Sequence, residues 1–281
     1  MSAQTAAKRI STADIAARKG GEPIVCLTAY DAPMASILDE QCDILLVGDS
    51  LGMVVHGLPS TVGVTMEMMI LHGQAVMRGS ARALVVVDMP FGSYEASPET
   101  AFTNATRLLK ETGAQAVKLE SGRYAADAIK FMVERGVPVM GHVGLRPQAI
   151  NVYGAFKARG RTTAERAEIL AEAEATAGAG AFAIVVEGVA EDLAREITER
   201  VRVPTIGIGA SSCCDGQILV TPDMLGVFDW TPKFVKRYAS LRASIKEAVD
   251  QYASEVRRRS FPEAAQVYRL GQPSRPVKPG A

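Results

Sequence analysis

The sequence predicts an α/β fold in which eight parallel strands alternate with helices and close into a (β/α)8 barrel of the TIM type. Short apolar runs recur along the chain, separated by helical patterns or long loops. Such alternation is typical of a parallel sheet, and eight strands suit closure into a barrel. An open, doubly wound sheet is the alternative. The expected strands are residues 24–28, 44–48, 84–87, 116–119, 137–140, 182–186, 205–208 and 217–220.

Helix signals lie between these strands in the first part of the chain. A short helix before the first strand can be capped by Ser11 or Thr12 and ends at Lys19, ahead of two glycines. Pro33 suits the first turn of the helix that follows the first strand. After a long loop, Met and Ile side chains spaced along one face predict a core-facing helix over 65–79.

The later units repeat the pattern with longer connections. Loop 89–99 leads to a helix that runs through residue 111, and a second long loop over 144–161 follows the fifth strand. Thr163 is a capping candidate for an alanine-rich helix. The remaining helices are expected over 124–134, 163–177 and 192–200.

The C-terminal part lies beyond the barrel. Residues 235–258 have a long amphipathic pattern that ends in arginines, which suits the helix dipole. We expect this long C-terminal helix to pack on the outside of the barrel or on another subunit. The tail over 266–281, rich in Pro, Gly and Arg, and the first residues, 1–8, are predicted to be flexible. The chain, 1–281, is otherwise expected to be a single barrel domain.

Composition limits the partners. With 48% hydrophobic residues among 281, the chain can bury the core of one large domain. Lys plus Arg and Asp plus Glu number 31 each, so no basic surplus favours nucleic acid or a membrane surface. No apolar run approaches the roughly 20 residues that span a bilayer, and no secretory signal is recognisable. We therefore expect a cytoplasmic protein that acts on small molecules.

Polar side chains recur directly after the carboxyl ends of the strands. In a parallel barrel these ends open onto one face, so residues far apart in the sequence converge on one pocket. The residues at these positions are Asp49 with Ser50, Asp88, Lys118 with Glu120, His142 and Glu187. The sequence therefore predicts a functional site at this face.

Three acids on consecutive strands predict a metal site. Asp49, Asp88 and Glu120 would repel one another if they were ionised together in a shared cleft. A hard divalent cation relieves that repulsion, and an all-oxygen ligand set suits Mg²⁺. The alternative for any one acid is that it caps the next helix or pairs with an arginine.

The other strand-end residues suggest roles in catalysis. Lys118 points the same way as Glu120 and could bind a substrate carboxylate, stabilise an enolate or pair with an acid. Glu187 follows an apolar run, where a raised proton affinity would suit a general base, although an ion pair is the alternative. His142 could contact substrate or tune Glu187, or be structural. His56 and His72 have no assigned role.

Several segments closely resemble the ketopantoate hydroxymethyltransferase family, in unbroken order from about residue 8 to about residue 262. The segments are VCLTAYDAPMA, DILLVGDSLGMVVHG, VDMPFGSYEASPE, AVKLESG, PVMGHVGLRPQ, VVEGV and IGIGASSCCDGQILVTPD. The resemblance implies transfer of a one-carbon unit from 5,10-methylenetetrahydrofolate to 3-methyl-2-oxobutanoate, which forms 2-dehydropantoate in pantothenate and coenzyme A biosynthesis.

The resemblance also assigns residues. It implies one Mg²⁺ per subunit at Asp49, Asp88 and Glu120, with Glu120 acting directly or through water. It implies keto-acid binding by Asp49, Ser50, Asp88 and Lys118, and proton abstraction by Glu187. It further implies a homo-oligomer, commonly a decamer.

Some loops depart from the family pattern, and two other functions compete. Residues 58–59, 62–63 and 211–214 differ from what the family favours, which makes the folate contacts less secure than the metal site. A related magnesium-dependent enzyme of the phosphoenolpyruvate mutase and isocitrate lyase type would carry a reactive cysteine on a flexible loop after strand four, and none of the four cysteines lies there. A catalytically silent binding barrel would have no reason to carry acids at four strand ends.

Overall fold

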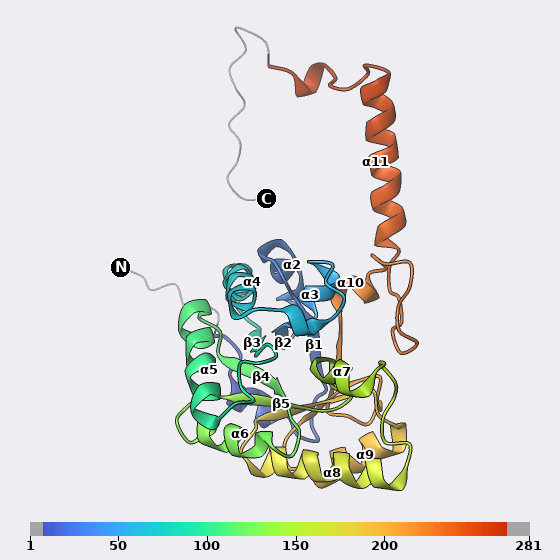
Figure 1. Ribbon diagram of the computed structural model, residues 1–281. Coiled ribbons are helices and arrows are strands. Elements are labelled where there is room, and N and C mark those ends of the chain that lie inside the picture. Colours follow the sequence, from blue (N-terminus) through green and yellow to red (C-terminus); the bar gives the residue numbers. More distant parts are fainter. Residues whose placement is uncertain (1–7, 269–281) are drawn as a thin grey trace, which may run out of the picture.

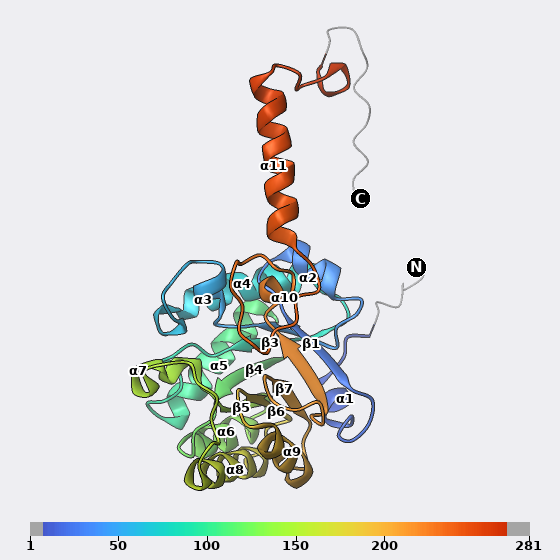
Figure 2. The same ribbon diagram turned by 90° about the vertical axis from the view of Figure 1, so that its right-hand side faces the viewer.

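The computed structural model describes residues 8–268 and contains a closed barrel of eight parallel strands, which confirms the predicted fold. Consecutive strands pair with each other, and β8 closes the ring by pairing with β1. Helices surround the ring in Figures 1 and 2. The strands are β1 (Ile24–Thr28), β2 (Ile44–Val47), β3 (Leu84–Asp88), β4 (Ala116–Glu120), β5 (Val139–Gly144), β6 (Ala183–Glu187), β7 (Thr205–Ile208) and β8 (Gly216–Leu219).

The two-residue period of the strands decides which polar side chains enter the barrel mouth. On β3, Leu84 and Val86 belong to a cluster drawn from all eight strands, which fills the ring. Val85 and Val87 belong instead to the cluster shared with the surrounding helices. Asp88 is the next member of the inward series, at the carboxyl end of the strand.

The same step carries three further strands from apolar interior residues to polar ones. In each strand, residues of the apolar interior cluster come before the polar ones, and all the strands end at the same face of the barrel. The series are Ala116, Lys118 and Glu120 on β4; Met140 and His142 on β5; and Ala183, Val185 and Glu187 on β6. One periodicity therefore both fills the barrel and builds the polar mouth.

Most helices follow the strands as expected. Thr65 and Ser97 cap α4 and α5, each by accepting a bond from the third backbone N–H of its helix. The helices are α1 (Thr12–Ala16), α2 (Ala32–Leu38), α3 (Leu51–Val54), α4 (Met66–Gly79), α5 (Pro98–Thr112), α6 (Ala125–Val133), α7 (Ile150–Tyr153), α8 (Thr163–Gly178), α9 (Glu191–Arg200), α10 (Thr221–Met224) and α11 (Leu241–Arg257). Short 3-10 turns are η1 (Thr61–Gly63), η2 (Pro147–Ala149) and η3 (Ala264–Gln266).

Several element boundaries differ from the sequence prediction. Thr162, not Thr163, caps α8, because its side chain accepts the Glu165 N–H. The fifth strand begins two residues later than expected, since the Val137 N–H still donates to the Met132 carbonyl at the end of α6. The predicted long loops over 56–63 and 144–161 contain η1, η2 and α7, and α3 lies just before the first of them. These elements are too short to show a helical period in the sequence.

The helix α11 differs most from expectation. It projects from the barrel in Figures 1 and 2, and none of its residues is buried. Of the two expected positions, packing on the outside of its own barrel is therefore contradicted, and packing on another subunit stays a prediction. It also starts at Leu241 rather than near 235. The Tyr238 N–H donates to the Met224 carbonyl and the Leu241 N–H to that of Leu225, which ties the preceding segment to the end of α10.

The expected flexible tails fall almost entirely on residues 1–7 and 269–281, which lie outside the described residues. From residue 8 to residue 268, no helix combines the length and the apolar character that crossing a membrane requires.

Candidate active site

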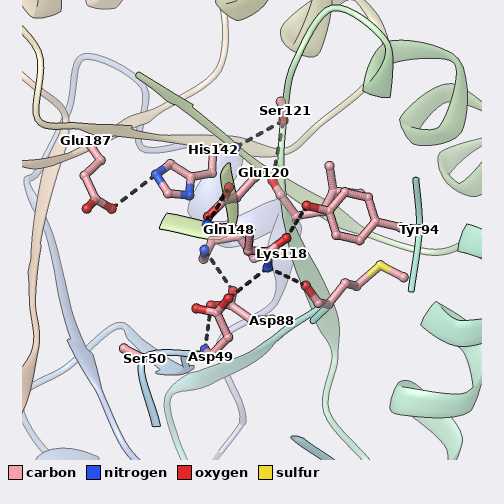
Figure 3. Close-up of polar contacts among 12 residues, drawn as sticks. Asp49, Ser50, Asp88, Tyr94, Lys118, Glu120, Ser121, His142, Gln148 and Glu187 are labelled. Carbon is pink, nitrogen blue, oxygen red and sulfur yellow. Dashed lines mark hydrogen bonds and ion pairs between the residues drawn. The ribbon is translucent and has the colours of Figure 1, made fainter. Parts of the chain in front are cut away.

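A cavity of about 1400 Å³ opens at the carboxyl ends of the strands and contains the predicted site. Residues from all eight strands and from several of the loops that follow them line it. The predicted residues that line it are Asp49, Ser50, Asp88, Lys118, Glu120, His142 and Glu187. The structure therefore brings together all the residues singled out from the strand ends, as Figure 3 shows.

Asp88 links two neighbouring strand ends. Its Oδ2 accepts the backbone N–H of Asp49 at 3.0 Å, and its Oδ1 lies 2.9 Å from the Lys118 Nζ. Both side chains of this ion pair are buried. A buried ion pair loses its solvation and requires close partners, so Asp88 and Lys118 fix each other in the mouth of the barrel.

The mouth carries more negative charge than its lysine balances. Burial, and then the nearby Asp88, raise the pKa of Asp49 to about 7. Burial, and then Asp49, also raise the pKa of Glu120 well above its usual range. Burial alone would lower the pKa of Lys118, but Asp88 and Asp49 outweigh it and raise that pKa. Three ionised carboxylates beside one ammonium would leave two negative charges uncompensated.

This excess charge and the all-oxygen donors fit a divalent cation. Asp49 and Asp88 are adjacent, whereas the Glu120 carboxylate is turned toward the backbone N–H of Gln148, 3.0 Å from its Oε1. Accordingly, no group of three His, Cys, Asp or Glu side chains within residues 8–268 is arranged to hold a metal ion as it stands. The arrangement fits two carboxylate ligands with Glu120 farther away better than a set of three direct ligands.

His142 and Glu187 form a second pair across the cavity. The His142 Nε2 lies 3.2 Å from the Glu187 Oε2, and Ser121 Oγ accepts the His142 backbone N–H at 3.1 Å. Burial, and then Lys118, lower the pKa of His142, so its imidazole is neutral near pH 7. The Glu187 carboxylate is partly exposed and faces an imidazole, so its surroundings are not the apolar setting expected from the preceding valines.

Three polar contacts in the site had no signal in the sequence. Gln148, in η2, donates from its side chain to Asp49 Oδ2 at 2.8 Å, and Tyr94 O–H donates to Gln148 Oε1 at 2.6 Å. Tyr30 O–H lies 2.8 Å from Ser50 Oγ. Gln148 and Tyr94 lie in loops, where no periodicity places a side chain, and only their nearness to a strand end could have marked them.

Other residues noted in the sequence lie outside this network. His56 and His72 contact each other, with their Nε2 atoms 2.9 Å apart, and the His72 Nδ1 lies 2.6 Å from the Tyr30 carbonyl oxygen. Cys213 and Cys214 lie between β7 and β8, Cys26 lies in β1 and Cys42 just before β2. All four are free thiols.

Solved structures with low sequence identity share the fold. A phosphonopyruvate hydrolase in complex with oxalate and Mg²⁺ superposes with a TM-score of 0.59 at 12% identity, over 94% of this chain and 93% of that chain. A 2,3-dimethylmalate lyase of the PEP mutase/isocitrate lyase superfamily gives 0.59 at 14% identity, over 92% and 89%. At such identities the likeness establishes the barrel alone.

Sequence comparison is far more specific. The family model described as ketopantoate hydroxymethyltransferase matches residues 9–264. Proteins named 3-methyl-2-oxobutanoate hydroxymethyltransferase are 72% identical in Phenylobacterium zucineum, over 93% of this chain and 95% of that protein, and 70% identical in Maricaulis maris, over 96% and 98%. The Caulobacter vibrioides protein of that name is 69% identical over 95% and 97%. The chain therefore belongs to the ketopantoate hydroxymethyltransferase family and is an enzyme with 3-methyl-2-oxobutanoate hydroxymethyltransferase activity.

Proposed function

We propose that this enzyme takes its one-carbon unit from 5,10-methylenetetrahydrofolate and activates the keto acid by metal-assisted enolisation in the cavity at the strand ends. One observation carries the proposal: the inward series of β3 to β6 ends in Asp88, Lys118, Glu120, His142 and Glu187 around a single cavity. The acids that fit a cation lie on one side of the cavity, and the partly exposed Glu187 lies on the other. This arrangement suits removal of a proton next to a ketone.

The keto acid would bind at the Asp49 and Asp88 side. Mg²⁺ held by Asp49 and Asp88, with Glu120 through water, would polarise the ketone and stabilise the enolate. The buried Lys118 ammonium offers a positive charge for the substrate carboxylate beside Asp88, and Ser50 offers a hydroxyl in the same cavity. A phosphonopyruvate hydrolase of the same fold was crystallised with oxalate and Mg²⁺, and this analogy of fold, which says nothing of the ligand residues, is consistent with a metal and an oxo acid in such a barrel.

Glu187 would accept the C3 proton of the keto acid. Its carboxylate is partly exposed toward the cavity, and the neutral His142 beside it can orient it through the 3.2 Å contact without carrying charge. The C3 carbon then forms a bond to the methylene carbon of the folate. One of the two bonds from the methylene carbon to nitrogen would break as this bond forms. Hydrolysis of the second carbon–nitrogen bond would supply the hydroxyl of the product, and each nitrogen would take a proton, one derived from C3 and one from the water.

Aromatic side chains at the cavity rim support a flat co-substrate. Phe156, Trp230 and Phe234 line the cavity and are 47%, 76% and 40% exposed. Exposed aromatic rings at a cavity offer stacking surfaces for a planar ring system. Phe156 follows α7, and Trp230 and Phe234 follow α10. The folate is therefore assigned to the rim and not to particular bonds.

The choice of donor can be tested by offering alternatives. With 3-methyl-2-oxobutanoate and Mg²⁺, we expect 2-dehydropantoate to form from 5,10-methylenetetrahydrofolate, as measured by mass spectrometry of the product. Formaldehyde at the same concentration should give little product in the absence of tetrahydrofolate. Equal rates from both sources would contradict a folate site.

We also propose that the exposed face of α11 packs against another copy of the chain in a homo-oligomer, a decamer by family resemblance. Ile245, Val249, Tyr252 and Val256 recur at helical spacing and are 43–57% exposed. An apolar helix stripe of this kind is costly in water and typical of a subunit interface.

Val249→Asp should therefore reduce the oligomer to smaller species in light scattering after size exclusion. The carboxylate introduced at position 249 would be buried at an apolar contact, and burying an unpaired charge is costly. Ser254 lies on the opposite face of the same helix from this apolar stripe. Ser254→Asp is therefore the matched control and should leave the mass unchanged. Identical masses for both variants and the wild type would rule out this face as the interface.

A further inference from the structure

One glutamine residue, through its side chain and its backbone, connects four consecutive strand ends in the site. Gln148 lies in η2, directly after β5, and is 5% exposed. Its Nε2 donates to Asp49 Oδ2, after β2, at 2.8 Å and to the carbonyl of Met89, after β3, at 3.0 Å. Its backbone N–H donates to the Glu120 carboxylate, at the end of β4 (Figure 3). No other described residue outside the predicted set bonds to both Asp49 and Glu120.

Tyr94 fixes the orientation of this amide. Its O–H donates to Gln148 Oε1 at 2.6 Å, so the amide oxygen is directed to Tyr94 and both amide hydrogens remain for Asp49 and Met89. The Tyr94 side chain is buried, and burial raises its pKa, so the hydroxyl keeps its proton. A flipped amide would place its NH2 against the Tyr94 hydroxyl and its oxygen against the Asp49 carboxylate and the Met89 carbonyl.

We infer that Gln148, oriented by Tyr94, is a positioning residue that sets which oxygen of Asp49 is presented to the keto acid and its metal. This inference rests on the proposed role of Asp49. The amide of Gln148 donates to Asp49 Oδ2. Asp49 Oδ1 accepts no hydrogen bond from residues 8–268, so this oxygen remains available at the cavity. The same residue holds Glu120 through its backbone, which keeps the two carboxylates apart in spite of their shared cavity.

The side-chain bonds of Gln148 and its backbone bond to Glu120 can be separated by mutation. A side-chain change at position 148 removes the bonds to Asp49, Met89 and Tyr94 but keeps the backbone bond to Glu120. Gln148→Met has a similar length and neither donates nor accepts strongly. Tyr94→Phe leaves Gln148 in place and removes only the hydroxyl that orients it. The two variants should therefore act in the same direction, with the smaller effect at Tyr94.

The test measures three quantities in the intact enzyme: keto-acid KM, kcat, and Mg²⁺ affinity by calorimetry. Losing a hydrogen bond to a charged group predicts about a tenfold to hundredfold rise in keto-acid KM for Gln148→Met, and a several-fold weakening of Mg²⁺ binding. For Tyr94→Phe we expect about a threefold rise in KM, consistent with a neutral hydrogen bond. Gln74→Met, on the outer helix α4 where Gln74 bonds to the Glu111 carbonyl, is the matched control and should change none of these.

A rise in KM with little change in thermal stability supports positioning, whereas a purely structural role would lower the melting temperature and leave KM and Mg²⁺ affinity of the folded fraction unchanged. If Gln148→Met does not fold, Tyr94→Phe decides, and wild-type KM and Mg²⁺ affinity in that variant would overturn the inference. A wild-type enzyme that binds no Mg²⁺ would instead refute the proposed metal site.

Discussion

Glu187→Gln is expected to abolish exchange of the C3 proton of 3-methyl-2-oxobutanoate with deuterated water. The carboxamide cannot accept a proton, and general base catalysis typically contributes about a hundredfold to ten-thousandfold. The Glu187 side chain is partly exposed in the cavity and 3.2 Å from His142, on the other side from the proposed metal site. Proton NMR of the keto acid without folate measures this step alone.

The same variant should bind Mg²⁺ almost as tightly as the wild type, because Glu187 is not among the proposed ligands. Glu191→Gln is the matched control: Glu191 lines the same cavity, bonded to Ser211, and its loss should leave exchange intact. Exchange at the wild-type rate in Glu187→Gln would remove this residue as the base.

Asp88→Asn should weaken Mg²⁺ binding strongly, by more than tenfold in calorimetry. The variant loses one proposed carboxylate ligand and also leaves the buried Lys118 ammonium without its 2.9 Å partner. Breaking a buried ion pair costs about 3–5 kcal/mol of stability. The melting temperature must therefore be followed with the affinity, and the affinity measured only where the protein is folded.

Lys118→Met separates metal binding from substrate binding. Removing the ammonium leaves Asp49 and Asp88 with their negative charge, so Mg²⁺ affinity should be kept or increased while keto-acid KM rises.

Folded Asp88→Asn protein with wild-type Mg²⁺ affinity would argue against ligation by Asp88.

The pH dependence of Mg²⁺ binding follows from Asp49. Its pKa is raised to about 7, so below that pH a bound proton competes with the metal and above it the carboxylate is free. We expect Mg²⁺ affinity to be full only about one pH unit above this pKa and to fall as the pH drops through 7 toward 6, with proton release on binding in calorimetry. Constant affinity over this range would indicate that Asp49 is not a ligand.

The sequence predicted the barrel because eight apolar runs alternate with helices, and it predicted most of the polar mouth because polar residues come directly after those runs. Apolar runs of four or five residues located β1 to β8, and the side chains that continue the inward series, from Asp88 to Glu187, were found by reading past each run. Ion pairs such as Asp88 with Lys118 then follow from adjacent strand ends, since Asp88 pairs in register with Lys118.

The contacts made by loops could not be predicted in this way. Gln148 and Tyr94 meet across 54 positions of sequence, and neither lies on a regular element long enough to show a period. The direction of α11 was also beyond reach, because an amphipathic pattern shows that a face needs a partner but not which surface provides it. The turn that Glu120 makes toward η2 depends on that same loop.

The most direct test of the account is deuterium exchange at C3 of the keto acid in wild-type enzyme, without folate, before and after removal of divalent metal by a chelator. If Asp49 and Asp88 share a bound cation, the enzyme should catalyse exchange with Mg²⁺ present. Exchange should stop in the metal-free enzyme and resume when Mg²⁺ is returned. Exchange at an unchanged rate in metal-free, folded enzyme would contradict the claim that Asp49 and Asp88 act through a bound metal.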